Sequence, residues 1–199
     1  MNDAEFVAWV DDHVRTDKRL PACRRVGDTV ELFEKNSDVD MTLRIEEVPE
    51  SVVIISPEDA KKWELFYGSK PKNWMKRCDY LLIGKTDGGY FAIFVELKKT
   101  LPEENDPKHE ENGYAQLRWS QPLLHYLVSV FNTDNSAGLS GAEFSIRYWQ
   151  IGERPSGDHV KSPVYLGEDE DVRFDGEHKG LTIHNRVTPL ISLRDLLES

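Results

Sequence analysis

Three charged residues near the middle of the chain have the types and the spacing of a metal-assisted catalytic site. Asp79 opens one apolar run, Glu96 and Lys98 close the next, and Asp87-Gly88 lies between the two runs. Asp-Gly is a preferred two-residue hairpin turn of type I′, in which both residues take positive φ. Pairing outward from that turn places Asp79 directly opposite Glu96. Strand alternation then places Lys98 on the same face as Glu96.

Two facing carboxylates need a compensating positive charge, because like charges opposite each other destabilise a pair of strands. A divalent cation supplies it, and Mg²⁺ prefers a few carboxylates together with waters and phosphate oxygens. Such an ion lowers the pKa of a coordinated water and neutralises charge that develops on a phosphodiester. Lys98 would position that water or hold the scissile phosphate. The alternative is a surface salt bridge between Lys98 and either acid.

An Asp at the start of one hairpin strand and Glu-x-Lys on its partner resembles the PD-(D/E)XK nuclease superfamily. Asp79, Glu96 and Lys98 stand at its three motif positions, with Cys78 where the name of the motif has Pro. The resemblance covers roughly residues 57–131. It implies Mg²⁺- or Mn²⁺-dependent hydrolysis of phosphodiester bonds, and it favours DNA over RNA because most of that superfamily acts on DNA. It also implies that the main-chain carbonyl of Leu97 ligates the metal.

Further site residues follow from the same resemblance. Many exonuclease-like members carry a Gln on the helix after the Lys strand, which here is Gln116. A Tyr commonly follows four residues later, but Ser120 stands there, so the match does not extend to the RecB-like group. An acid on a preceding helix often completes the metal shell, and Glu64 is the candidate whose helix lies closest before Asp79. The chain offers three alternatives to it, Glu5, Glu31 and Glu46.

The elements that must position these residues combine helices and strands. Apolar residues at helical spacing, with capping residues such as Ser56 before Pro57, predict helices over 3–15, 57–67, 113–131 and 192–197. Besides the hairpin of residues 78–100, β-favouring runs predict strands at 29–35, 39–48, 51–56, 143–151 and 181–187. The first three of these strands suggest an antiparallel meander. Pro122 predicts a kink or a break in its helix, and residues 101–112 and 167–177 are expected to be acidic loops.

This order of elements predicts an α/β fold. Both hairpin strands are apolar on both faces, as central strands are. With the resemblance, the expected architecture is a restriction-endonuclease-like mixed central β-sheet flanked by helices 57–67 and 113–131. A chain of 199 residues fits one domain, with its core at about 57–151 and decorations at both ends.

The charge distribution bears on partners. The net charge of −11 argues against non-specific coating of nucleic acid. Residues 61–77, however, carry six basic side chains against one acid, a net of +5, with aromatic residues between them. Four of the basic residues are candidate nucleic-acid contacts: Lys70, Lys72, Lys76 and Arg77. The alternative for this segment is aromatic core packing beside solvated lysines.

Other features of the sequence bear on the cellular location and on alternative functions. No apolar run is long enough to span a bilayer, and the acidic N-terminus does not read as a signal peptide, so we expect a cytoplasmic protein with no membrane partner. The main rival is a catalytically inactive nuclease fold that serves as a binding or assembly subunit. A further rival is an acidic nucleic-acid mimic that uses loops 103–111 and 168–177. A homodimer is compatible with the resemblance, because small nucleases that cut both strands commonly dimerise.

Overall fold

The structure is a computed structural model of the whole chain. It describes residues 5–14, 23–36, 39–57, 77–98, 101, 107–152, 172–178 and 180–198. The predicted helix 57–67 lies outside the described residues from position 58 onward. The same holds for residues 102–106 of the predicted loop 101–112 and for residues 167–171 of the predicted loop 167–177.

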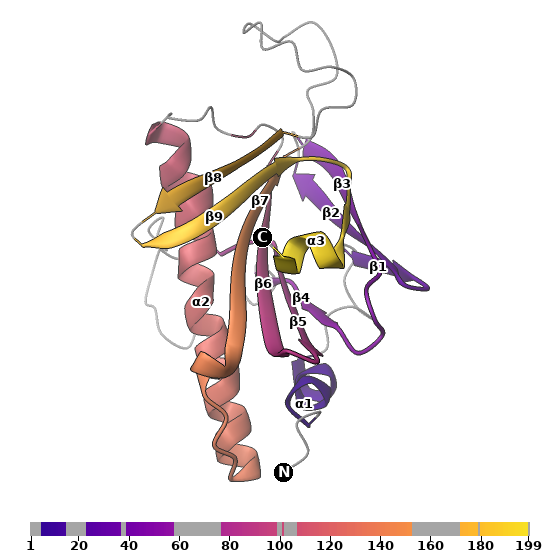
Figure 1. Cartoon of the computed structure of the whole chain (residues 1–199), viewed down its shortest axis with the longest axis vertical. Helices are drawn as coiled ribbons and strands as arrows, with labels where there is room; N and C mark the ends of the chain where they lie inside the picture. The colour runs from indigo at the N-terminus through magenta and orange to yellow at the C-terminus, as the bar shows by residue number, and fades with distance from the viewer. Residues whose placement is uncertain are drawn as a thin grey trace, which may run out of the picture.

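Along the described chain, six strands follow the first helix, and four more strands lie between the long helix and the closing helix (Figure 1). The helices are α1 (Glu5–Val14), α2 (Pro107–Asn135) and α3 (Leu193–Glu198), with a short 3-10 helix at Gly141–Glu143. The first strands are β1 (Cys23–Val26), β2 (Thr29–Asn36), β3 (Val39–Glu46) and β4 (Val53–Ile55). The later strands are β5 (Tyr80–Thr86), β6 (Gly89–Lys98), β7 (Phe144–Gly152), β8 (Val172–His178), β9 (Leu181–Val187) and β10 (Leu190–Ser192). No helix in the described part is long and apolar enough to cross a membrane.

The strands form two mixed sheets. The larger has the order β4-β5-β6-β7-β9-β8, in which β4, β5 and β6 are an antiparallel meander and β7 and β9 run parallel to β6. The smaller has the order β1-β2-β3-β10, with β10 parallel to β3. Parallel neighbours need a crossover, and α2 supplies it between β6 and β7. The expected α/β class is therefore confirmed.

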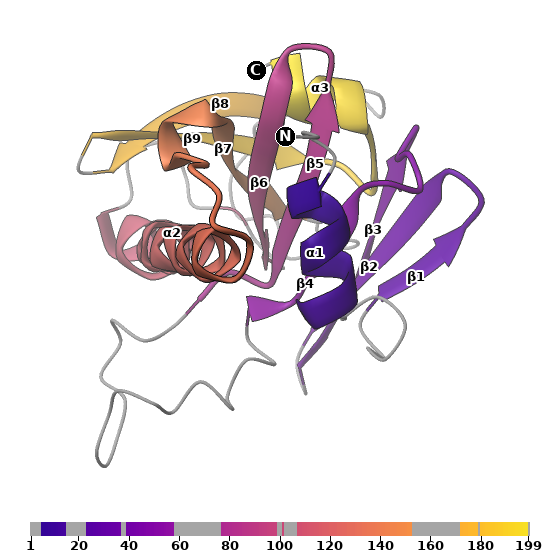
Figure 2. The ribbon, with the colours of Figure 1, turned by 90° about the horizontal axis from the view of Figure 1, so that it is seen from below.

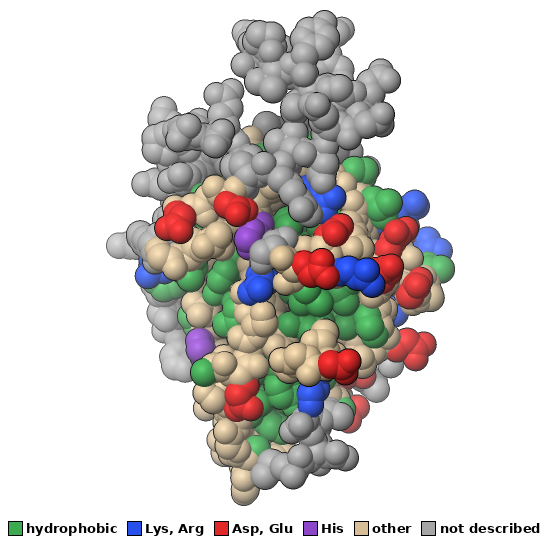
Figure 3. Space-filling model, in the orientation of Figure 1, with side chains coloured by type: hydrophobic (Ala, Val, Ile, Leu, Met, Phe, Trp, Pro, Cys, Tyr) green, Lys and Arg blue, Asp and Glu red, His purple; other side chains and the backbone are tan. Residues whose placement is uncertain are grey.

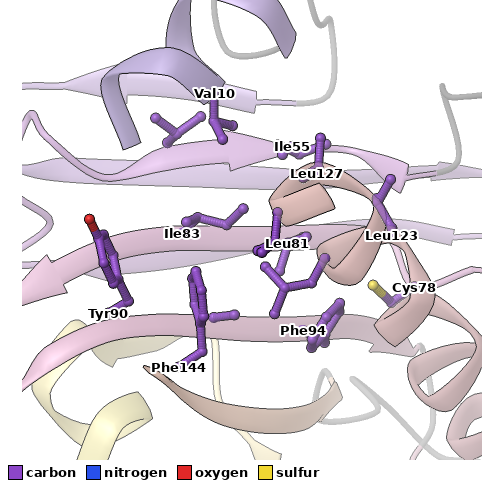
Figure 4. Close-up of a cluster of buried hydrophobic side chains, with 14 of the residues drawn as sticks. Val10, Ile55, Cys78, Leu81, Ile83, Tyr90, Phe94, Leu123, Leu127 and Phe144 are labelled. Atoms are coloured by element: carbon purple, nitrogen blue, oxygen red, sulfur yellow. The ribbon is translucent and has the colours of Figure 1, made fainter. Parts of the chain in front are cut away.

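Two apolar layers lie on the opposite faces of the larger sheet. On one face, α1 and α2 cover a cluster that includes Val10, Leu81, Phe94 and Leu127 (Figure 4). On the other face, the smaller sheet and α3 cover a second cluster around Trp149. Figure 2 shows α2 and strands β1 to β3 on opposite sides of β5 and β6. The hairpin strands are thus buried on both faces, as their continuous apolar pattern predicts.

Most predicted elements are present. The N-terminal helix, both hairpin strands, the strands at 143–151 and 181–187 and the closing helix are confirmed. The meander prediction is wrong in one respect, because β4 pairs with β5 of the larger sheet instead of following β3 in the smaller one. The predicted loop 167–177 is wrong over its last part, where β8 pairs with β9.

Two details of the backbone differ from the predictions. The helix predicted at 113–131 extends to residues 107 and 135 and runs through Pro122 without breaking. The predicted loop 101–112 is therefore wrong over residues 107–112, which form the first turns of α2. The hairpin turn lies at Asp87-Gly88 as predicted, but the positive φ of 116° belongs to Gly89, so the type I′ prediction is wrong. The Gly88 N–H donates to the Thr86 hydroxyl over 3.2 Å. This side-chain hydrogen bond stabilises the turn locally.

Candidate active site

The hairpin register brings the two predicted acids together. The β5–β6 ladder runs from Thr86 opposite Gly89 to Tyr80 opposite Val95. One further step places Asp79 across from Glu96, as predicted from the turn. Both carboxylates lie on the face of the sheet that α2 covers, at the end of β6 that is uppermost in Figure 1.

Burial makes the ionised form of both carboxyl groups energetically unfavourable. Asp79 is 7% exposed and Glu96 is 1% exposed. Burial, and then the negative charges of Glu96 and Glu34, raise the pKa of Asp79 well above its usual range, while the Leu97 N–H and Lys98 oppose that rise. The Leu97 N–H donates to Asp79 Oδ2 over 2.6 Å and fixes the orientation of that carboxyl group.

Lys98 is the cationic partner of the site. Its ammonium donates to Glu96 Oε1 and also to Gln116 Oε1, the latter over 3.1 Å. Burial alone lowers the pKa of Lys98, but the Glu96 and Asp79 carboxylates outweigh it, and the pKa lies above its usual value. Lys98 is therefore an ammonium ion at neutral pH. It can hold an anion or stabilise a leaving oxygen, but it cannot accept a proton.

Helix α2 contributes a second layer of contacts through Gln116 and Ser120. Gln116 Nε2 donates to the carbonyl of Arg77 over 3.2 Å, while its Oε1 accepts from Lys98. One turn further along, the Ser120 hydroxyl donates to the carbonyl of Gln116 and accepts the Cys78 N–H, each over 2.7 Å. These bonds fix the residues just before Asp79 to the helix. Ser120, which departs from the superfamily pattern, therefore has its own positioning role.

A further carboxylate, Glu34 of β2, was not among the predicted residues and acts on the site through its charge, because it helps to raise the pKa of Asp79. Alternation with the buried Val30 and Leu32 places Glu34 on the face of β2 that packs on the larger sheet. Tyr80 joins that strand to β5, because its hydroxyl donates to the Phe33 carbonyl over 2.8 Å and accepts the Phe33 N–H over 3.1 Å. The only signal in the sequence was the position of Glu34 within an alternating strand.

The donor set suits a hard divalent ion only in part. Asp79 and Glu96 supply carboxylate oxygens, which Mg²⁺ and Mn²⁺ prefer. Within the described residues, however, no cluster of three or more His, Cys, Asp or Glu side chains is arranged to hold a metal. The remaining ligands would have to come from the main chain, from water or from substrate, which is the usual situation for Mg²⁺.

Of the remaining predicted site residues, the structure describes only Arg77. Glu64 and the three lysines of the basic segment, Lys70, Lys72 and Lys76, lie outside the described residues. Arg77 is partly exposed beside the site and contributes its carbonyl to Gln116.

The alternative acids lie elsewhere or are not placed. Glu31 forms a 3.1 Å ion pair with Arg44 within the smaller sheet, and Glu46 is exposed at the end of β3. The side chain of Glu5 is outside the described set. The structure therefore brings together Asp79, Glu96, Leu97, Lys98 and Gln116.

The surface shown in Figure 3 mixes acidic and basic side chains around apolar areas. No protein-family model, curated protein or solved structure matches the chain. Inference about function therefore depends on the site.

Proposed function

We propose that this chain is a metal-dependent nuclease of the PD-(D/E)XK type, with a restriction-endonuclease-like core, that hydrolyses phosphodiester bonds. The observation that carries the proposal is the convergence of Asp79, Glu96 and Lys98 at the ends of two paired strands. A helix that follows the second strand adds Gln116, which is hydrogen-bonded to Lys98. Asp, Glu and Lys at these positions form the motif of that superfamily, and the Gln on the next helix is common among its members.

Asp79 and Glu96 would hold Mg²⁺ or Mn²⁺, with the Leu97 carbonyl as a further ligand implied by the resemblance. The two buried carboxyl groups that face each other outnumber the one Lys98 ammonium beside them, so a further cation would stabilise both in the ionised form, which supports this assignment. When bound, the ion would activate water and neutralise charge on the phosphate. The raised pKa of Asp79 means that protons compete with metal for this carboxylate, so metal affinity should increase with pH.

The roles of the other residues follow from their contacts. Lys98 carries a proton at neutral pH and would orient the attacking water or the scissile phosphate through N–H donation. Gln116 holds the Lys98 ammonium within reach of Glu96, and Leu97 holds Asp79 through its N–H. The surroundings of these groups are buried and exclude water, which lowers the local dielectric constant. Each of these electrostatic contacts is therefore stronger than it would be in solvent.

The substrate proposal is nucleic acid, with DNA favoured over RNA because the resembling superfamily acts mostly on DNA. Arg77, at the start of the described segment before Asp79, would contact backbone phosphate together with the lysines of the basic segment. A net charge of −11 disfavours tight non-specific binding, so substrate affinity should depend on local contacts and on salt.

A second candidate is a catalytically silent nuclease fold that binds a partner. Two observations favour it. The described residues offer two acids at the site without a three-residue metal cluster. In addition, Lys98 is bonded to Glu96, where a cation would otherwise lie. Metal binding distinguishes the candidates, since a silent scaffold has no need of it.

The test is cleavage of linear DNA, circular DNA and RNA in Mg²⁺ and in Mn²⁺. Wild type is compared with Glu96→Gln and Lys98→Met, and with two exposed controls, Glu46→Gln and Lys85→Met. We expect metal-dependent cutting that both site variants lose and both controls retain. Cutting of circular DNA would identify an endonuclease. Absence of cutting on every substrate, together with absence of Mn²⁺ binding by calorimetry, would overturn the proposal in favour of the silent scaffold.

A further inference from the structure

The buried polar side chains of the described chain are concentrated beneath the first half of α2. All of them except Ser56 belong to one group, the polar band: Asp79, Glu96, Gln116, Ser120, Gln150 and Asn185. Most of the remaining buried side chains on this face are apolar. Such a concentration is unexpected from packing alone, since burying a polar group is unfavourable unless a partner satisfies it.

Strand register places part of this band in a row. Glu96 of β6 pairs with Gln150 of β7, and Gln150 pairs with Asn185 of β9. Directly paired residues on neighbouring strands point to the same face of a sheet. Gln150 is therefore the lateral neighbour of Glu96 on the side away from Asp79.

Gln150 has two properties that its neighbours do not explain. It is 2% exposed, and no hydrogen bond reaches its Oε1 within the described part of the chain. The backbone of α2 also closes directly over it, because a Cβ at Gly113 would lie 2.5 Å from Gln150 Nε2. The amide is thus enclosed between sheet and helix, beside a carboxylate of the site, with an acceptor still available. A buried amide oxygen that accepts no hydrogen bond lowers the stability of the folded state.

We infer that Gln150 is a positioning residue for Glu96 in the metal-loaded site, an inference that rests on the proposed function. With a divalent cation held by Asp79 and Glu96, the Gln150 amide would donate an N–H to the neighbouring Glu96 carboxylate and orient it. Its Oε1 would remain available to accept a hydrogen bond from a donor at the site. Glycine at position 113 leaves the amide in this position, because a Cβ there would lie 2.5 Å from Gln150 Nε2 and the amide would have to move.

The next strand supports this arrangement. Asn185 Nδ2 donates to the Tyr114 hydroxyl over 2.9 Å, which fixes the side chain next to Gln150. Tyr114 in turn lies against Gly176, where a Cβ would approach its hydroxyl to 2.2 Å. Two glycines, one on the helix and one on β8, thus leave space for the side chains of the band.

The test measures the dissociation constant of Mn²⁺ by titration calorimetry, and cleavage as a function of Mn²⁺ concentration. The variants are Gln150→Ala, Gln150→Leu, which keeps the side-chain volume, Gly113→Ala and the double variant Gly113→Ala/Gln150→Ala. Gly138→Ala is the control, because a Cβ there meets nothing within 4 Å. Circular dichroism and thermal unfolding verify that each variant is folded.

We expect each single site variant to weaken Mn²⁺ binding by about 10- to 100-fold, the usual effect of removing a residue that orients a ligand. Cleavage should recover at saturating Mn²⁺, which a general structural defect would not permit. Gly113→Ala should add nothing in the Gln150→Ala background, because the amide that it displaces is gone. The control should match wild type.

Wild-type Mn²⁺ affinity in Gln150→Leu or in Gly113→Ala would overturn the inference and leave the proposed function intact. Additive effects in the double variant would also overturn it, because Gly113 would then act independently of Gln150. Failure of wild type both to bind Mn²⁺ and to cut nucleic acid would overturn the proposed function, and with it this role for Gln150.

Discussion

Lys98 and Gln116 are joined by a 3.1 Å hydrogen bond although they lie 18 positions apart in the chain. The same Gln116 amide donates to the carbonyl of Arg77, two residues before Asp79. One side chain of α2 thereby links the end of β6 to the approach to β5. The site consequently depends on the position of the helix as well as on the hairpin.

Removing that link should slow catalysis. In Gln116→Ala, Lys98 loses a neutral acceptor and keeps only its carboxylate partner, so its ammonium is less well oriented toward substrate. We expect the proposed cleavage rate at saturating Mg²⁺ to fall by about 10- to 100-fold, as for other residues that orient a catalytic group. Gln121→Ala, on the same helix, is the matched control. Equal rates for the two variants would refute this role for Gln116.

Ser120 should matter for stability. Ser120→Ala would leave the buried Cys78 N–H without its acceptor, which costs about 1–3 kcal/mol. In a domain of this size, that loss lowers Tm by about 2–4 °C for each kcal/mol. Urea unfolding followed by circular dichroism measures it, and Ser129→Ala, exposed on the same helix, is the control. A variant as stable as wild type would mean that water replaces the hydroxyl.

Asp79 should destabilise the metal-free fold at high pH. Its pKa is raised in the folded state, so its favourable contribution is complete below about pH 4, its unfolded pKa, and is lost as pH rises through the folded value. Asp79→Asn keeps an acceptor for the Leu97 N–H and removes the charge. We expect it to be more stable than wild type at pH 8 in EDTA, because the variant does not bury a negative charge beside Glu96. The difference should shrink as pH falls.

Thermal unfolding between pH 5 and pH 9 tests this expectation, with Asp87→Asn in the exposed turn as the control. A stability difference that does not depend on pH would show that charge is not its cause. Saturating Mn²⁺ should reverse the order, because only the carboxylate binds the ion well.

The charge of Glu34, which belongs to the smaller sheet, should affect the pKa of Asp79. Because the Glu34 charge helps to raise the pKa of Asp79, Glu34→Gln should lower that pKa. A carbon-13 NMR titration of the Asp79 carboxyl group measures the change. Glu31→Gln is the control, since Glu31 is paired with Arg44 elsewhere on the smaller sheet. An unchanged titration in Glu34→Gln would mean that solvent screens this charge completely.

Local patterns predicted the position of the hairpin turn and the strand register, because turn-favouring residues and alternation both act over a few neighbouring residues, although the turn type was wrong. They did not predict the partner of β4, since nothing in Val53–Ile55 distinguishes a strand that continues the first sheet from one that begins the second. The strand β8 was missed because its acidic surroundings resemble a loop, although pairing with β9 outweighs that composition.

The residues of the candidate site divide in the same way, into those that local patterns indicate and those that depend on distant contacts. Asp79, Glu96 and Lys98 follow from the hairpin, and Gln116 follows from the resemblance to the nuclease superfamily. Glu34 and Gln150 depend on contacts between elements that are distant in sequence, which a single sequence does not specify. Ser120 looked like a defect in a family pattern, whereas in the structure it bonds the helix to the residue before Asp79.

The hairpin turn at Asp87-Gly88 also constrains how this protein can change. Both halves of the site lie on one hairpin, so the length of the turn sets which residue faces Glu96. Deleting or inserting one residue there would shift the register and turn Asp79 toward the opposite face of the sheet. The exposed turn can therefore vary freely in composition but not in length, and insertions should be tolerated better in loops whose length does not set this register.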